Sequence, residues 1–194
     1  MCIRDSPNLV RRCLTEGTHA DEDEIDSAVA VFRRHYAVVN GARTRIYPGV
    51  GELLERLRGH GLPLAVVTNK AEAFTLPLLE RMAIAHYFDA VVSGDTLPEK
   101  KPHPQPLLLA AGRLGRRPGA CAYVGDAERD MLAARAAGMH GVLATFGYLD
   151  PATTWNDWPC VATIARLGEL LPWLRLNGLV ASVPLPAGAV FAAP

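Results

Sequence analysis

Short apolar runs alternate with helix-favouring segments between Tyr47 and Phe146, and this alternation restricts the folds that the chain can adopt. The apolar runs predict strands at 64–67, 90–93, 120–125 and 141–146. Helices are predicted in the segment that carries Leu53, Leu54 and Leu57, at 71–82, after Pro106 and at 131–137. Strands that alternate with helices favour a parallel sheet covered on both faces. The sequence therefore predicts an α/β fold.

The composition argues against several classes of partner. The 20 Lys and Arg residues balance the 20 Asp and Glu residues, and no stretch is strongly basic, so neither nucleic acid nor an anionic membrane is an expected partner. No apolar stretch approaches the roughly 20 residues that a membrane span needs. A disulfide framework or zinc site is not expected either, because the cysteines are far apart, at Cys2, Cys13, Cys121 and Cys160. This pattern favours reduced thiols in the cytoplasm.

The chain divides into four predicted parts. Residues 1–6, "MCIRDS", are interpreted as a leader that is not native to the fold. Residues 7–46 are predicted to be helical, because Ile25, Val29, Phe32 and Tyr36 recur at helical spacing. The α/β core is predicted at 47–175, and the Pro-, Ala- and Gly-rich tail at 176–194 is predicted to be disordered.

Polar residues follow three of the predicted strands. Thr68 and Asn69 offer a hydroxyl, an amide and backbone N–H groups at a helix start, which suit phosphate oxygens. Lys101 stands in a segment that its prolines stiffen. Asp126 and Asp130 follow the third strand, where a pair of carboxylates suits a metal ion. The structural alternatives are a helix cap for the polar residues and an exposed basic turn for the lysine.

These three stretches resemble motifs of the haloacid dehalogenase-like (HAD) hydrolases, and in particular of the phosphoglycolate phosphatase group. The matching stretches are "VVTNK", "SGDTLPEKKPHPQPLL", "YVGDAERDMLAARAAGM" and the loop "TFGY", and the resemblance covers about 45–173. It implies a Rossmann-like parallel sheet as the core. It also implies that the helical part at 7–46 is a partial cap domain.

The resemblance also implies a role for each site residue. Thr68 and Asn69 would hold the transferring phosphoryl group, and Lys101 would neutralise the phosphate and the attacking carboxylate. Asp126 would ligate Mg²⁺, with Asp130 orienting the metal shell. The charges are consistent with these roles, because a dianionic phosphate that approaches carboxylates needs a cation and a metal to offset the repulsion.

One motif of the family is missing from this sequence. The nucleophile of the family lies in Asp-x-Asp-Gly-Thr after an apolar strand, and no such stretch is present. We reject Asp21-Glu22-Asp23 as a substitute, because it follows no apolar strand and precedes Glu24 rather than Gly-Thr. We therefore expect a fragment that begins inside the cap and lacks the central strand between those ending at Thr68 and Gly125.

The predicted function is Mg²⁺-dependent hydrolysis of a small phosphorylated metabolite, 2-phosphoglycolate, through an aspartyl-phosphate, by a monomer or homodimer. This chain alone is expected to be inactive. The segment "TTWNDWP" favours an alternative, a phosphatase for N-acetylmuramic acid 6-phosphate or another sugar phosphate. A dehalogenase is less expected, because it needs no metal and would leave Asp126 and Asp130 without a role. A receiver domain is also less expected, because its acidic residues precede its Thr and Lys, which is the reverse of the order in this chain. A catalytically silent binding module is the other alternative.

Overall fold

The computed structural model describes residues 21–147 and 154–180. The predicted leader at 1–6, the start of the cap at 7–20, Tyr148 of the "TFGY" loop and most of the predicted tail lie outside these ranges. Within them no helix is both long enough and apolar enough to cross a membrane.

Strands and helices alternate along the described chain as the sequence predicts. The strands are β1 (Ala65–Val67), β2 (Ala90–Val92), β3 (Ala122–Gly125), β4 (His140–Ala144) and β5 (Ala162–Ile164). The α-helices are α2 (Glu22–Val39), α3 (Val50–Gly59), α4 (Glu72–Arg81), α5 (Gln105–Arg113), α6 (Glu128–Ala136) and α7 (Leu170–Leu176). Short 3₁₀ turns are η2 (Ala85–Tyr87), η3 (Pro118–Ala120) and η4 (Leu167–Glu169).

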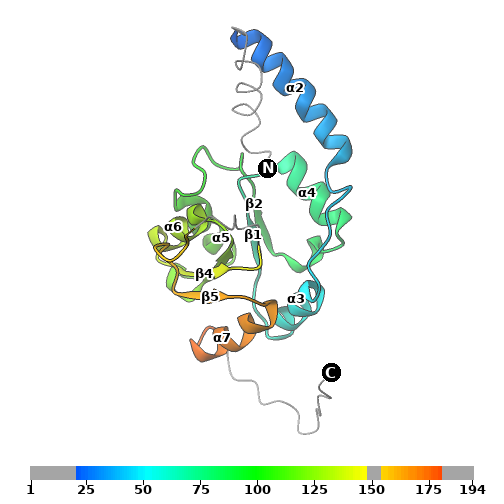
Figure 1. Cartoon of the computed structure of the whole chain (residues 1–194). Helices are drawn as coiled ribbons and strands as arrows, with labels where there is room; N and C mark the ends of the chain where they lie inside the picture. Colours follow the sequence, from blue (N-terminus) through cyan, green and yellow to red (C-terminus); the bar gives the residue numbers. More distant parts are fainter. Residues whose placement is uncertain (1–20, 148–153, 181–194) are drawn as a thin grey trace.

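Every strand pair in the described ranges is parallel, which confirms the predicted α/β class. β1 pairs with β2, and β4 lies between β3 and β5 in a second sheet. The two sheets run in different directions in Figure 1. No ladder joins β1 to β3 among the described residues. The expectation that a central strand belongs between them stays a prediction.

Helices cover both faces of the sheets, as predicted. On one face α3 and α7 pack against β4 and β5 through a buried apolar cluster of Leu57, Val142, Ala144, Ile164, Leu170, Leu171, Leu174 and Val180. On the other face α5 and α6 form a cluster of Leu107, Ala133, Ala134 and Ala137, against which Val67 and Tyr123 pack. Burial of these side chains supplies the main driving force for folding. It also fixes the strand ends from which the polar residues project.

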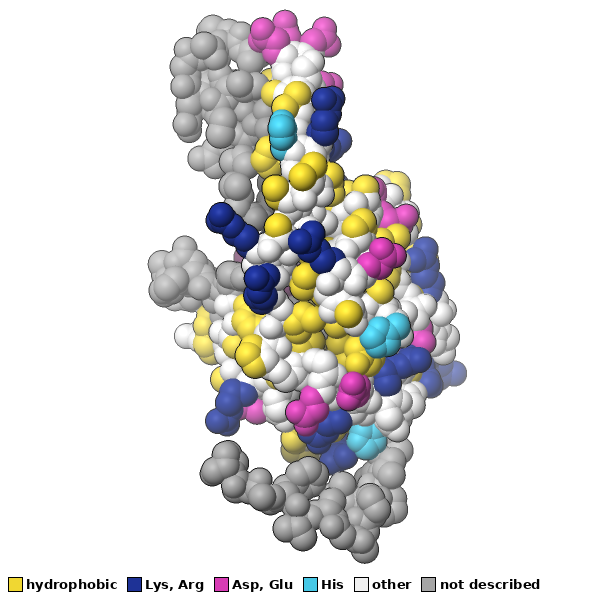
Figure 2. Space-filling view, turned by 90° about the vertical axis from the view of Figure 1, so that its right-hand side faces the viewer, with side chains coloured by type: hydrophobic (Ala, Val, Ile, Leu, Met, Phe, Trp, Pro, Cys, Tyr) yellow, Lys and Arg dark blue, Asp and Glu magenta, His cyan; other side chains and the backbone are white. Residues whose placement is uncertain are grey.

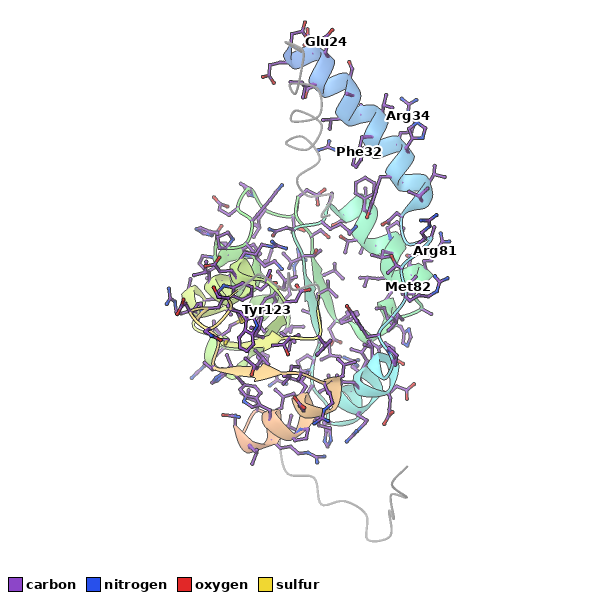
Figure 3. All side chains as sticks on the ribbon, in the orientation of Figure 1. Glu24, Phe32, Arg34, Arg81, Met82 and Tyr123 are labelled. Carbon is purple, nitrogen blue, oxygen red and sulfur yellow. The ribbon has the colours of Figure 1, made fainter. Side chains whose placement is uncertain are left out.

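Helix α2 extends away from the strands and approaches the rest of the molecule near α4 (Figure 1). It starts with a capping box, in which the Asp21 side chain accepts from Glu24 N and the Glu24 side chain accepts from Asp21 N. Figure 3 places Glu24 at the end of α2 remote from the strands. The rejected Asp21-Glu22-Asp23 stretch is therefore an exposed helix start, as the sequence indicates.

Three sequence-based predictions need correction. The strand predicted at 141–146 runs from His140 to Ala144, so Phe146 lies in the turn that follows. Strand β5 was not predicted, because a three-residue strand shows no usable periodicity and forms through its pairing with β4. Helix α7 continues to Leu176, where the tail was predicted to start. Buried Leu170, Leu171 and Leu174 stabilise this helix despite its internal proline.

Candidate active site

The predicted site residues gather where strands end. Thr68 and Asn69 follow β1, Asp126 follows β3 directly, and Asp130 lies in the first turn of α6. Lys101 comes from the loop that leads into α5. β1 and β3 belong to different sheets, so strand pairing alone does not bring their carboxyl ends together. The contacts described next show that Asn69, Lys101 and Asp130 do meet.

The ammonium group of Lys101 lies at the centre of this region. Its Nζ donates to the Val67 carbonyl oxygen at 3.0 Å and to the Tyr123 hydroxyl at 2.6 Å. It also forms an ion pair with Asp130 Oδ1 at 2.8 Å, and both side chains are less than 10% exposed. An ammonium group has three N–H donors, so all three of Lys101 have partners. The structural alternative of an exposed basic turn therefore does not apply to Lys101.

Burial and charge act on Lys101 in opposite directions. Burial disfavours the ammonium form and lowers the pKa of Lys101 below its ordinary 10.5, while the Asp130 carboxylate raises it in part. Asp126 acts in the same direction as Asp130, more weakly. A cation in this environment gains from any further anion that comes close.

Asn69 holds the backbone of Lys101. Its Nδ2 donates to the Lys101 carbonyl at 2.9 Å, and its Oδ1 accepts from the Lys101 N–H at 3.0 Å. Both polar ends of this buried amide are thus used within the protein. Close packing reinforces the arrangement, since a Cβ on Gly94 would lie only 2.0 Å from the Asn69 carbonyl oxygen. Asn69 positions Lys101 here, and its contact with a phosphoryl group stays a prediction.

Thr68 remains able to bind a ligand. Its backbone N–H donates to the Val92 carbonyl at 2.9 Å, which extends the β1–β2 pairing by one residue. Its hydroxyl oxygen accepts from the Lys70 N–H at 3.1 Å. A hydroxyl that accepts one hydrogen bond can still donate one. Thr68 is partly exposed, so a phosphate oxygen is a suitable acceptor for that proton.

The two aspartates differ in their surroundings. Asp130 is buried, and its Oδ2 accepts from Ala127 N at 3.2 Å at the start of α6, while Oδ1 faces Lys101. Asp126 is partly exposed. Glycines make room for both carboxylates, because a Cβ on Gly125 would lie 2.5 Å from Asp130 Cβ and one on Gly147 would lie 2.5 Å from Asp126 Cβ.

The donor chemistry of the aspartates fits Mg²⁺, which prefers carboxylate and water oxygens. In the described ranges no group of three or more His, Cys, Asp or Glu side chains gathers as a metal centre. Asp126 would then be the direct ligand, and Asp130, already paired with Lys101, would act from beside it. Both roles and the metal itself stay predictions.

Tyr123 belongs to the site, although the sequence shows it only as one residue of a strand. Its hydroxyl donates to Val67 O at 3.1 Å and lies 3.5 Å from Asp130 Oδ1. Figure 3 places the side chain in the interior, between the strands. Burial, strengthened by Asp130, raises the pKa of Tyr123 well above 10.0. A tyrosine in an apolar strand needs a hydrogen-bond partner for its hydroxyl when the ring packs inward, and this is the signal that could have identified it.

A second lysine lies where α2 meets this region. Lys70 follows Asn69, and its Nζ donates to the Tyr36 hydroxyl at 2.6 Å while lying 4.8 Å from the ring centroid. The Tyr36 ring packs edge-on against Phe74 of α4, with centroids 5.2 Å apart. Helix α2 thus contacts the loop that carries Thr68.

Comparison with known proteins gives a consistent result. The family of haloacid dehalogenase-like hydrolases matches residues 11–144. A phosphoglycolate phosphatase of Nitrosospira multiformis is 49% identical over 163 residues, which is 83% of this chain and 71% of that protein. The phosphoglycolate phosphatase of Escherichia coli K12 is 44% identical over 66% of this chain, and the match spans 50% of the relative's length.

Solved structures agree. A predicted phosphoglycolate phosphatase from Haemophilus somnus is 32% identical, with a TM-score of 0.79 over 87% of this chain and 75% of that one. The β-phosphoglucomutase of Clostridium difficile shares the fold at a TM-score of 0.71, with 18% identity over 89% of this chain and 76% of that one. The chain therefore belongs to the haloacid dehalogenase-like hydrolase family, and the curated relatives reported above are phosphatases.

Proposed function

We propose that the chain provides the phosphate-binding and metal-binding half of a Mg²⁺-dependent phosphomonoester hydrolase that acts on 2-phosphoglycolate. The observation that carries the proposal is the buried Lys101, whose Nζ lies 2.8 Å from Asp130 at the strand ends. Relatives named phosphoglycolate phosphatase support the choice of substrate over a sugar phosphate. The expected location is the cytoplasm, and the expected state is a monomer or homodimer.

Lys101 would receive the phosphate by exchanging a partner. Its three N–H groups are occupied, two of them by the neutral oxygens of Val67 and Tyr123. A phosphate oxygen that replaces a neutral acceptor carries negative charge, so the ammonium group attracts it more strongly than the neutral oxygen. Asn69 keeps the Lys101 backbone in place during the exchange. Thr68 would donate its hydroxyl proton to another phosphate oxygen.

When bound at Asp126, Mg²⁺ would supply positive charge that offsets the repulsion between the phosphate and the carboxylates. Asp130 holds Lys101 beside that position through their ion pair. The covalent step requires a nucleophile that this sequence does not contain in the family's Asp-x-Asp-Gly-Thr form. Asp21 and Asp23 are exposed at the start of α2 and do not replace it. We therefore propose that this chain alone binds phosphate esters and does not turn them over.

Titration calorimetry in Mg²⁺ tests the binding half of the proposal. We expect 2-phosphoglycolate to bind the parent chain and to lose about tenfold or more in affinity in Lys101→Met, since each 1.4 kcal/mol is a factor of about ten. Lys100→Met is the matched control, because the neighbouring Lys100 is exposed. Equal loss in both variants would show that only general positive charge is needed.

A phosphate-release assay tests the catalytic half. The parent chain should release no phosphate above background, and a chain extended upstream by a strand ending in Asp-x-Asp-Gly-Thr should release it only with Mg²⁺. Steady turnover by the parent chain, abolished in Asp126→Asn, would overturn the proposed inactivity.

A further inference from the structure

Lys70 and Lys101 differ in the groups that contact their ammonium groups. The backbone of Lys70 is fixed, because its N–H donates to Thr68 Oγ1 at 3.1 Å and its carbonyl accepts from Gly94 N at 2.7 Å. Its ammonium group contacts Tyr36, and no ion pair of Lys70 exists among the described residues. An ammonium group has three donors, so two of them remain for a ligand. This partly buried cation is thus ready for an anion.

Tyr36 completes the site from the cap side. Its hydroxyl accepts from Lys70, which leaves the hydroxyl's own proton available. The ring is held by its edge-on contact with Phe74 and by stacking on Phe32, with centroids 5.2 and 6.3 Å apart. Figure 3 shows Phe32 on the same helix, α2. A fixed cation and a fixed hydroxyl donor therefore stand together where α2 meets the loop of Thr68.

Two adjacent donors of this kind match the two oxygens of a carboxylate, which accepts hydrogen bonds on both. Thr68, two residues before Lys70, lies on the side where the phosphate is expected. A small phosphate ester with a carboxylate on its other end carries one negative group for each of the two lysines. Each negative group would then meet its own buried or partly buried cation.

We propose that Lys70 and Tyr36 bind the carboxylate of the leaving group, which restricts the substrates to phosphomonoesters of small hydroxy acids. The inference rests on the proposed function. It adds the protein groups that would recognise the carboxylate of the substrate. It also assigns to α2 a direct contact with the substrate through Tyr36.

The test compares 2-phosphoglycolate with ethyl phosphate, which carries a methyl group in place of the carboxylate. Calorimetry in Mg²⁺ should show that the parent chain binds 2-phosphoglycolate about tenfold or more tightly than ethyl phosphate. Lys70→Met should bring the affinity for 2-phosphoglycolate down to that for ethyl phosphate. Lys70→Arg should keep most of the preference, and Tyr36→Phe should reduce it several-fold. Lys100→Met is the control and should keep the values of the parent.

The outcomes separate the two proposals. If the parent chain binds neither ester, the proposed function is wrong, and this inference is wrong as well. If it binds both esters equally, the proposed function stands and carboxylate recognition is wrong. If Lys70→Met and Lys70→Arg both weaken the two esters to the same extent, Lys70 only shapes the loop, and the inference is also overturned.

Discussion

Two regions are held by different means: helix α2 and the strand-end cluster of Asn69, Lys101, Tyr123 and Asp130. In the cluster every polar group has a partner in the protein, and Lys101 and Asp130 are less than 10% exposed. Helix α2 spans Glu22–Val39, and only Ile25 and Val29 are buried along it. Its described contacts with α4 and the Thr68 loop are made by Tyr36 and by Asn40, which donates to the Phe74 carbonyl at 2.8 Å.

This difference indicates that the cluster and helix α2 have different roles. A buried network tolerates little change, because an unpaired polar group in it costs its full desolvation energy. A helix attached through a few contacts can change its side chains without unfolding the core. The reacting phosphate suits the first region, and the variable part of a substrate suits the second. The space-filling view shows acidic side chains at the free end of α2, and mixed charges over the rest of that face (Figure 2).

The largest effect is expected from breaking the cluster at Lys101. In Lys101→Met the buried Asp130 carboxylate loses its cation, and removal of one partner of a buried pair costs about 3 to 5 kcal/mol. The free energy of unfolding in urea measures this loss. The control is Arg166→Met, which breaks the surface pair with Glu169, where the Arg166 side chain is 84% exposed. Similar losses in the free energy of unfolding in both variants would show that the buried pair stabilises the fold no more than the surface pair does.

A smaller effect is expected at the Tyr123 hydroxyl. In Tyr123→Phe, Lys101 loses one acceptor and Val67 O loses one donor, so we expect a loss of about 1 to 2 kcal/mol in the free energy of unfolding. Tyr87→Phe is the control, because the Tyr87 hydroxyl contacts exposed Glu55. No difference between the two variants would remove Tyr123 from the cluster.

A comparison of the parent chain with Tyr123→Phe also tests the pKa of Tyr123. Because the folded pKa is raised above 10.0, the folded chain keeps this proton at a pH where the unfolded chain loses it. The unfolded state then binds fewer protons, so the parent chain loses stability as the pH rises through 10. Tyr123→Phe lacks this term, and its stability should fall less steeply in the same range.

The smallest effect is expected at the free end of α2. Asp21→Ala removes the N-cap bond to Glu24 N, which measures 2.8 Å, and should cost about 1 kcal/mol. Hydrogen exchange in the first turn of α2 should speed up, while exchange in β3 and the affinity for phosphate esters stay as in the parent. Asp23→Ala, two residues further along and without the capping bond, is the control. A loss of ester binding in Asp21→Ala would show that this end of α2 takes part in the ester site.

Some features of the fold follow from local signals in the sequence. The apolar runs before Thr68 and Gly125 predict strands because they are short, bounded and continuous, and β1 and β3 end at Val67 and Gly125. The acidic start of α2 has the capping pattern that the structure shows. Strand β5 has no such signal, because its three residues form a strand only through hydrogen bonds to β4.

The sequence by itself determined which residues stand near the strand ends. The order of Thr68, Lys101 and Asp126, and the polar residues around them, follow directly from the amino-acid sequence. The tertiary structure alone decided what these residues touch. It gave both polar ends of Asn69 to the Lys101 backbone, brought Tyr123 from β3 to the Val67 carbonyl, and set Lys70 against Tyr36. Each of these contacts joins residues more than 30 positions apart, and their partners are fixed by packing, which no local pattern encodes.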